Sequence, residues 1–334
     1  MINPEYKKNL LTLHTSPKDG SPYWIDFFQR NHLDIDEIIE DPLSIPPMDI
    51  NVLRQYPLEY FIPRAVLESN RYLITGETSG FTGKPVITAY TEQEFHNGFI
   101  QPFLDSAQSR GFPVKSRWLW AGPTGPHIIG KAVRAILKYV NGLDPFSIDF
   151  DPRWYRKLPE DSLSRKRYMA HIHDQIMDII NLQRIDVIFS TPPVIAMLCE
   201  EMSQSAREQI RGIHYGGVGM SPEEYDGFHK SFPNAVHISG YGNSLAGVFI
   251  EESFDSDGIE YNTVSDRIEI RIVNESPDGL APCSIGERGR VMISRYDESF
   301  LILNMLERDW AVRTSIGLKN PGPRDTIKLQ KVLY

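Results

Sequence analysis

The residues with the clearest chemical potential lie in one stretch, Thr75-Gly-Glu-Thr-Ser-Gly-Phe-Thr-Gly-Lys-Pro85. It combines glycines with several hydroxyl groups and the ammonium of Lys84. Glycines let a loop turn several backbone N–H groups toward one anion, and the hydroxyls and the ammonium add hydrogen bonds and charge. This composition predicts a loop that binds a polyphosphate.

The stretch differs from the Walker A phosphate loop, Gly-x4-Gly-Lys-Ser/Thr. Thr78 stands where that pattern has its first glycine, and Pro85 follows Lys84. A residue before proline is disfavoured in the helical conformation. The apolar runs 72–74 and 86–90 flank the stretch, so we expect a β-hairpin with a glycine-rich tip. This reading disfavours a Walker-type kinase.

Beyond the hairpin, the chain alternates between strand and helix patterns. Thr91 and Glu94 form a capping box that predicts a helix over 92–110, and Ser221 and Glu224 form a second one. We expect strands at 115–121, 146–150, 185–189, 210–215 and 235–239, with helices at 127–140, at 164–182, after the cap Thr191-Pro192 and after Ser221. Such alternation predicts a parallel sheet with ligands at the carboxyl ends of its strands.

Glycine clusters follow the expected strands at Gly122–Gly125, Gly216–Gly219 and Gly240–Gly242. Their shared position at strand carboxyl ends predicts one extended ligand cleft, although each cluster alone is also typical of an ordinary turn.

The pattern changes after Gly258. Residues 266–273 alternate as Arg267, Glu269 and Arg271 against isoleucines, which predicts a half-exposed strand, and further strands are expected at 290–294 and 300–305. The expected fold class is α/β, with a large layered αβαβα domain and a small β-rich, barrel-like subdomain. We divide the chain into an irregular N-terminal covering segment (1–70, with helical patches at 23–30 and 50–56), an α/β core (71–257) and a β-rich part (258–334).

Composition excludes several classes of function. The 334 residues carry a formal charge of −9. Nucleic-acid binding needs a basic face, so this negative charge argues against that function. No apolar run approaches the roughly 20 residues of a membrane-spanning helix, and the N-terminus lacks the apolar segment of a secretory signal. Cys199 and Cys283 make neither a disulfide framework nor a metal cluster; we expect buried thiols and a cytoplasmic location.

Motifs in a fixed order over about residues 70–330 resemble the ANL adenylate-forming superfamily of acyl- and aryl-CoA ligases, adenylation domains and luciferases. The similarity is greatest to the phenylacetate–CoA ligase branch. The motifs are the phosphate loop Thr78–Pro85 (family Thr-Ser-Gly-x-Thr-Gly-x-Pro, with bulky Phe81 at a position usually Ser or Thr), the adenine-side loop Gly216–Gly219, Tyr241-Gly-Asn-Ser-Leu245 (family Tyr-Gly-x-Thr/Ser-Glu), Asp309 in Glu307-Arg308-Asp309, and the hinge Gly322–Lys328.

The resemblance implies that ATP, with Mg²⁺, activates a carboxylic acid as an acyl-adenylate. It assigns the ATP phosphates to Thr78, Ser79, Gly80, Thr82, Gly83 and Lys84, with Thr82 and Lys84 as catalytic groups. It assigns adenine and ribose to Gly216, Gly217, Gly240, Tyr241, Gly242, Asn243, Ser244, Asp309 and Arg324, with the Tyr241 ring on adenine and Asp309 accepting from the ribose hydroxyls.

Two departures from the family limit this expectation. Leu245 replaces the glutamate that helps to hold Mg²⁺, and leucine has no oxygen ligand. The ion would then be held by phosphates, water and another carboxylate, or adenylation would be weak; no metal ligand is assigned. The sequence also ends just after the hinge, so we expect the family's C-terminal lid to be absent and only the first half-reaction to occur.

The candidates for the acyl pocket are His127, Trp120 and Gly217. Trp118 and Trp120 share one face of a strand, which favours a core position, and a structural role is favoured for His127 as well. The branch implies an aryl or heteroaryl acid, such as a phenazine carboxylate in antibiotic biosynthesis of the D-alanylgriseoluteic acid kind. A similarity in layout to the acyl-protein synthetases of luminescent bacteria implies transfer to a partner such as an aldehyde-forming reductase.

Two alternatives remain open. One is a non-catalytic protein of the same fold that binds nucleotide or aromatic acid, because Leu245 and the expected absence of a lid would remove turnover. The other is an aryl-CoA ligase whose lid is supplied in trans. Pyrophosphate exchange on ATP separates a catalyst from a binding protein.

Overall fold

The fold is known from a computed structural model that describes residues 2–78, 80, 83–277 and 279–324. The predicted hairpin is present: β1 (Leu73–Glu77) pairs antiparallel with β2 (Ile87–Thr91). Residues Ser79, Phe81 and Thr82 of its tip, and residues 325–328 of the hinge motif, lie outside the described part of the chain.

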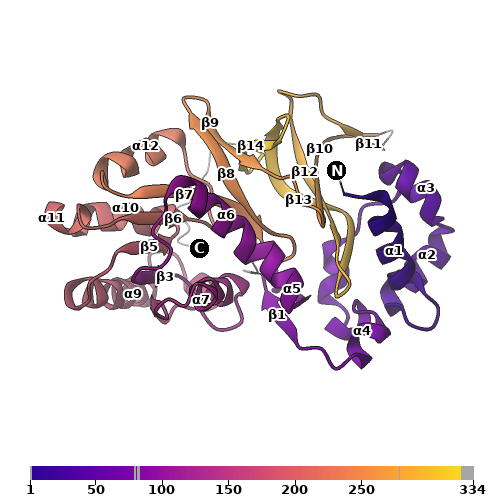
Figure 1. Cartoon of the computed structure of the whole chain (residues 1–334), viewed down its shortest axis with the longest axis horizontal. Helices are drawn as coiled ribbons and strands as arrows, with labels where there is room; N and C mark the ends of the chain where they lie inside the picture. The colour runs from indigo at the N-terminus through magenta and orange to yellow at the C-terminus, as the bar shows by residue number, and fades with distance from the viewer. Residues whose placement is uncertain (1, 79, 81–82, 278, 325–334) are drawn as a thin grey trace.

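All the other strands of the described residues join one 12-stranded sheet in the order β11-β10-β12-β13-β14-β9-β8-β7-β6-β5-β3-β4 (Figure 1). The parallel part contains β3 (Trp118–Ala121), β4 (Phe146–Ser147), β5 (Val187–Ser190), β6 (Gly212–Tyr215) and the first half of β7 (Val236–Asn243). The antiparallel part contains β8 (Gly247–Asp255), β9 (Gly258–Asn262), β10 (Ile268–Ser276), β11 (Gly279–Pro282), β12 (Arg288–Tyr296), β13 (Leu301–Arg313) and β14 (Gly317–Gly322). This mixed α/β architecture confirms the predicted fold class. The domain boundaries remain a prediction, since one sheet continues across residue 258.

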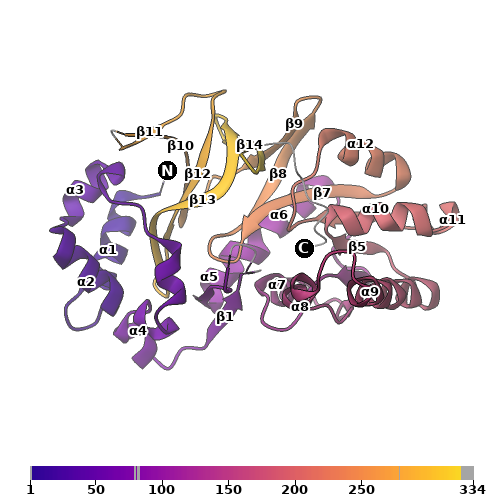
Figure 2. The same cartoon turned by 180° about the vertical axis from the view of Figure 1, so that it is seen from behind.

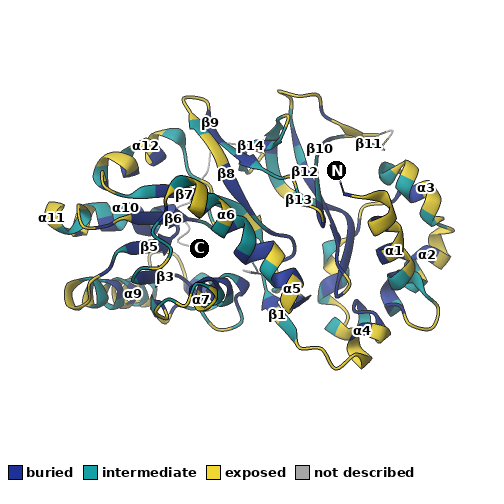
Figure 3. Cartoon of the chain, viewed as in Figure 1, coloured by how far each residue is buried: buried dark blue, intermediate teal, exposed yellow. Residues whose placement is uncertain are grey.

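Helices cover both faces of the parallel part (Figures 1 and 2). Trp118 and Trp120 of β3 pack in one cluster with residues of α6 (Gln101–Arg110) and α7 (Ile128–Tyr139). Leu119, between them, packs in another cluster with residues of α9 (Leu163–Leu182), α10 (Pro192–Glu201) and α12 (Pro222–Ser231). Strands β3, β5 and β6 are buried along their whole length, β4 and the ends of β7 are not, and the helices are exposed on their outer sides (Figure 3). The remaining helices of this part are α5 (Glu92–Phe95), a π-helix (His96–Ile100), α8 (Pro152–Lys157) and α11 (Gln204–Arg207).

Both capping boxes are confirmed. The Thr91 hydroxyl accepts from the Glu94 amide and the Glu94 carboxylate accepts from the Thr91 amide, and Ser221 and Glu224 do the same. No helix among the described residues is long and apolar enough to cross a membrane.

The N-terminal part is more helical than the sequence suggested. Helices α1 (Pro4–Thr15), α2 (Pro22–Asn31), α3 (Ile35–Glu40) and α4 (Arg64–Glu68) are accompanied by short 3-10 turns at Pro42–Ser44, Ile50–Arg54 and Leu58–Tyr60. Asn3 caps α1, and Pro4 occupies its first turn. The indole of Trp24 donates to the carbonyl of Leu301 at 3.1 Å, so this segment covers β13.

Three further predictions need correction. Gly240–Gly242 lie inside β7 rather than in a loop after it, because the strand continues to pair with β8. A side chain at Gly242 would place its Cβ 2.1 Å from the carbonyl oxygen of Gly247, so glycine permits this close approach. Arg267 is 4 % exposed rather than on an open face, because it forms an ion pair with Asp297. Cys283 is buried, whereas Cys199 is only half-buried.

Buried histidines predict acid sensitivity. Burial lowers the pKa values of His14 and His214 to about 4 and that of His237, beside His229, to about 3. The folded state therefore holds them neutral. Their stabilisation is fully present above the unfolded pKa of about 6.5 and is lost as the pH falls toward 4. We expect the urea midpoint to fall steeply between pH 6.5 and 4. His214→Phe should reduce that slope and the exposed-site control His171→Phe should not; equal slopes in all three proteins would contradict this.

Candidate functional site

The base of the phosphate loop is closed by a reciprocal pair. The Thr78 amide donates to the Val86 carbonyl and the Val86 amide donates to the Thr78 hydroxyl oxygen, both at 2.9 Å. Arg54 supports the other side, since its Nε donates to the Lys84 carbonyl at 2.7 Å. Gly80 and Gly83 have φ values of +65° and +150°, which side chains rarely adopt. The Lys84 side chain is exposed, so its ammonium is accessible to an anion.

The segment Tyr241–Ser244 lies beside this loop. The Ser244 hydroxyl donates to the carbonyl of Glu77, the last residue of β1, at 3.2 Å. The Tyr90 hydroxyl holds the Ser244 carbonyl at 2.7 Å. Asn243 turns the chain back, because its side-chain oxygen accepts from the amides of residues 245 and 246. These contacts bring the second motif to the foot of the phosphate loop.

β13 brings carboxylates to the same segment. Asn243 Nδ2 donates to Glu307 Oε1 at 2.6 Å, and the Tyr241 hydroxyl lies 3.4 Å from Asp309 Oδ2. Glu307 and Asp309 therefore both face this segment, although the pairing of β13 with β12 is irregular between Leu306 and Trp310. Glu307 was not among the predicted site residues, although its spacing from Asp309 could have identified it.

Burial perturbs the titration of these groups. Burial, together with the nearby charge of Asp309, raises the pKa of Glu307 to about 7. Burial also raises the pKa of Asp309, against the opposing effects of Arg308 and the Tyr241 hydroxyl. A cation bound between the two carboxylates would relieve this cost.

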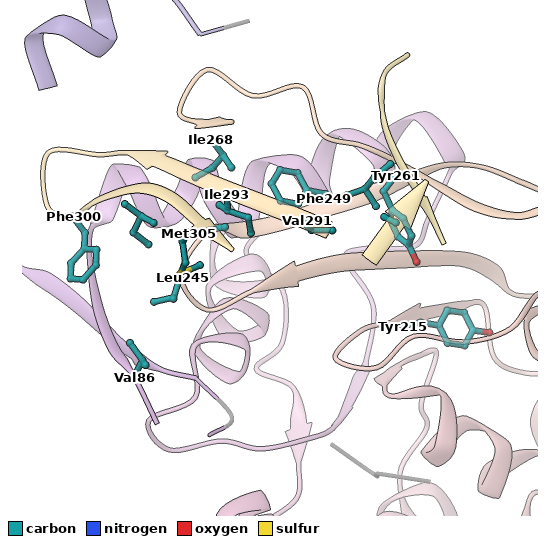
Figure 4. Packing of buried hydrophobic residues seen from close by; sticks show 14 of the residues in the cluster. Val86, Tyr215, Leu245, Phe249, Tyr261, Ile268, Val291, Ile293, Phe300 and Met305 are labelled. Atoms are coloured by element: carbon teal, nitrogen blue, oxygen red, sulfur yellow. The ribbon is translucent and has the colours of Figure 1, made fainter. Parts of the chain in front are cut away.

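Leu245 does not face these carboxylates. Its side chain is buried in the apolar cluster with Val86, Phe300 and Met305 (Figure 4). Position 245 therefore serves packing and offers no oxygen to a metal ion.

The adenine-side loop follows β6. The Gly216 amide donates to the Ser190 carbonyl at 3.2 Å, and Gly217 has a φ of +85°. A Cβ at Gly219 would lie 3.3 Å from the carbonyl oxygen of Pro321, so the loop approaches β14. The assignment of Gly216 and Gly217 to adenine stays a prediction.

Three predicted residues have less direct relations to the site. Arg324 stacks on the Trp310 ring at 4.8 Å, and Trp310 alternates with Asp309 on β13. Trp120 is 2 % exposed and its indole donates to the Pro123 carbonyl at 3.2 Å. His127 is buried at the start of α7, next to Glu77. The predicted roles of Arg324 in ribose binding and of Trp120 and His127 in the acyl pocket remain predictions.

Glu307 gives a prediction that needs no ligand. Its raised pKa means that the protonated form is favoured on folding, so its stabilisation is present below pH 4.5 and is lost as the pH rises through 7. Glu307→Gln mimics the protonated form and keeps an acceptor for Asn243. We expect it to raise the free energy of unfolding by about 1–3 kcal/mol at pH 8 and by little at pH 4. The exposed Glu59→Gln should change neither value; a loss of stability in Glu307→Gln at pH 8 would contradict the buried-carboxylate interpretation.

No protein-family model and no curated protein matches the sequence. Several solved structures are similar to this chain in their fold. One is 2-hydroxyisobutyryl-CoA ligase in complex with 2-HIB-AMP and CoA, with a TM-score of 0.68, 13 % identity, and coverage of 97 % of this chain and 68 % of that one. Another is the luciferase-like enzyme of the mealworm Zophobas morio, with a TM-score of 0.53, 14 % identity and coverage of 99 % and 76 %.

A likeness at such low identity shows the fold. The chain has the fold of these enzymes, which is the fold that the resemblance to the ANL superfamily predicted.

Proposed function

We propose that the protein uses ATP to activate a carboxylic acid as an acyl-adenylate. The observation that carries this proposal is the convergence of the motif segments: Ser244 bonds the foot of the phosphate loop, while Asn243 and Tyr241 contact Glu307 and Asp309. The fold likeness to a ligase whose structure contains 2-HIB-AMP supports the same class of reaction.

In the proposed reaction a carboxylate oxygen attacks the α-phosphorus of ATP. The new O–P bond forms as the bond to pyrophosphate breaks, and pyrophosphate leaves with its electron pair. Lys84 and the amides of the phosphate loop bind the β- and γ-phosphates, and Thr78, Ser79 and Thr82 add hydroxyl groups. Their contribution is positioning and charge stabilisation.

Tyr241 and Asp309 would hold the nucleoside. The half-buried Tyr241 ring offers a face to adenine, and the Asp309 carboxylate accepts from the ribose hydroxyls. Gly216 and Gly217 would border the base, and Arg324 would close the ribose side.

Mg²⁺ fits a site at Glu307 rather than at position 245, because the Asp309 carboxylate is taken by the ribose hydroxyls in the proposed site. The carboxylate of Glu307 is buried and its pKa is raised, so a cation would favour its charged form. No group of three or more His, Cys, Asp or Glu suited to a metal occurs among residues 2–324 as described. Mg²⁺ commonly binds through one or two carboxylates, phosphates and water. When bound, it would neutralise phosphate charge, and Glu307 would help to orient it.

We further propose an aryl or heteroaryl acid, such as a phenazine carboxylate, and transfer to a partner such as a reductase. The similarity of the motifs to the phenylacetate–CoA ligase branch supports this finer assignment. Hydroxamate trapping tests it: the protein, ATP and hydroxylamine are incubated with phenazine, benzoic and aliphatic acids. We expect hydroxamate from aromatic acids. Product from aliphatic acids alone would contradict the aromatic assignment while leaving adenylation intact.

A further inference from the structure

Helix α8 carries two arginines, and one of them contacts the residue at the foot of the phosphate loop. Arg153 and Arg156 are three residues apart and so share one side of the helix. Arg153 Nη1 donates to Glu77 Oε2 at 3.0 Å, and its Nε donates to Asp151 at 3.2 Å. Glu77 ends β1 immediately before Thr78. The ion pair therefore fixes this side of α8 against the foot of the loop (α7 and α8 are labelled in Figure 2).

Arg156 differs from Arg153, because its terminal nitrogens have no hydrogen-bond acceptor among the residues described. Both of these nitrogens are buried. Burial lowers the pKa of Arg156, and repulsion from Arg308 and Arg153 opposes the attraction of Asp151. A guanidinium whose buried nitrogens lack an acceptor is unfavourable, and an oxyanion such as a carboxylate or a phosphate can satisfy its fork of donors.

His127 adds a second unsatisfied group in the same neighbourhood. It is 5 % exposed, and its Nε2 has no partner within the described part of the chain. Its backbone forms a bridge with Glu77. Burial, helped by the charges of Arg153 and Arg156, lowers the pKa of His127 to about 4, so the ring is neutral and can donate one hydrogen bond.

We propose that Arg156 and His127 form an oxyanion subsite, positioned by the Glu77–Arg153 ion pair, which takes a carboxylate or phosphoryl oxygen of a ligand bound beside the phosphate loop. The subsite rests on the proposed function for its ligands. Two sources share this chemistry: the polyphosphate of ATP, and the carboxylate of the acid. Arg156 supplies the charge and the two donors, and neutral His127 supplies a directional hydrogen bond.

The test uses the whole protein and calorimetric titration with inorganic pyrophosphate, ATP and benzoate separately. Arg156→Gln removes the charge, Arg156→Lys keeps the charge without the fork, and Lys157→Gln removes a neighbouring exposed charge as the control. We expect Arg156→Gln to weaken the binding of one class of probe, either pyrophosphate and ATP or benzoate, roughly 10- to 100-fold, the range for a charge-assisted hydrogen bond. Arg156→Lys should recover part of that loss, and Lys157→Gln should change affinity by less than about 2-fold. Thermal unfolding confirms that each variant is folded.

The outcomes separate the sources. Weaker binding of pyrophosphate and ATP alone assigns the subsite to phosphoryl oxygens, and weaker binding of benzoate alone assigns it to the substrate carboxylate. Three outcomes overturn the subsite: an equal loss of affinity in Arg156→Gln and Lys157→Gln, no loss of affinity in Arg156→Gln, or no binding of any probe by the wild type. Pyrophosphate exchange by the wild type is measured in parallel. If the wild type catalyses exchange and Arg156→Gln binds every probe as the wild type does, the subsite is overturned and the proposed function stands. If Arg156→Gln weakens binding but the wild type catalyses no exchange, the subsite stands and the proposed function is overturned.

Discussion

Replacing Asp297 with alanine is expected to lower the free energy of unfolding by about 3–5 kcal/mol, because the change leaves two arginines buried without their counter-charge. Asp297 is 1 % exposed and Arg295 is 0 % exposed. Arg267 Nε donates to Asp297 Oδ1 at 2.8 Å, and Arg295 Nε donates to Oδ2 at 2.5 Å. Burial alone would raise the pKa of Asp297, but the two guanidinium groups outweigh it and keep that pKa low.

The Asp297 cluster also supports the candidate site. Arg295 donates to the carbonyls of Ala89 and Leu245 at 2.7 and 3.1 Å, and Arg267 donates to the carbonyl of Ala246 at 2.9 Å. The cluster thereby ties the hairpin strand β2 to the segment after Ser244. Losing it should loosen both motifs as well as the core.

Chemical denaturation with two comparisons checks the Asp297 prediction. Asp297→Asn keeps the shape of the side chain and should lose less than Asp297→Ala. Asp226→Ala breaks the exposed pair with Lys230 and should cost under about 1 kcal/mol. A loss in Asp297→Ala no greater than in Asp226→Ala would show that the buried cluster is not a major source of stability.

Replacing Asp309 with alanine is expected to raise the KM for ATP roughly 10- to 100-fold, with a smaller change in kcat. In the proposed site the Asp309 carboxylate accepts from two ribose hydroxyls, and each is a charge-assisted hydrogen bond. These bonds exist before and during the reaction, so their loss weakens binding in the ground state and the transition state alike. The Tyr241 hydroxyl, 3.4 Å away, orients the carboxylate.

Steady-state kinetics at saturating acid measures the effect of Asp309→Ala. The matched control is Asp257→Ala, at an exposed position of the turn between β8 and β9. An unchanged KM in Asp309→Ala would show that the ribose assignment is wrong, and an equal rise in both variants would point to a general loss of charge.

Features that depend on neighbours in sequence were predictable. The hairpin β1–β2 follows from two β-prone runs around a glycine-rich tip, and each capping box follows from residues three apart. The order of the motifs predicted that the segment of Ser244 and the phosphate loop belong to one site. The hydrogen bond between Ser244 and Glu77 itself is visible only in the structure.

Features that depend on distant partners were not predictable. Alternation predicts an exposed face for Arg267, but the ion pair with Asp297, the residue directly after β12, holds it in the core. The glycines of β7 were placed in a loop, because their approach to Gly247 of β8 is visible only in three dimensions. Arg153 and Arg156 lie on a short helix without a motif, so nothing in the sequence connected them with the phosphate loop.

The most direct test of ATP-dependent carboxylate activation is the exchange of labelled pyrophosphate into ATP with a panel of carboxylic acids. Exchange requires reversible formation of the acyl-adenylate and no downstream partner. We expect acid-dependent exchange by the wild type and a strong reduction in Lys84→Ala, whose exposed ammonium belongs to the phosphate loop. No exchange with any acid, from a protein that still binds ATP, would contradict the proposed reaction and indicate a non-catalytic nucleotide-binding protein.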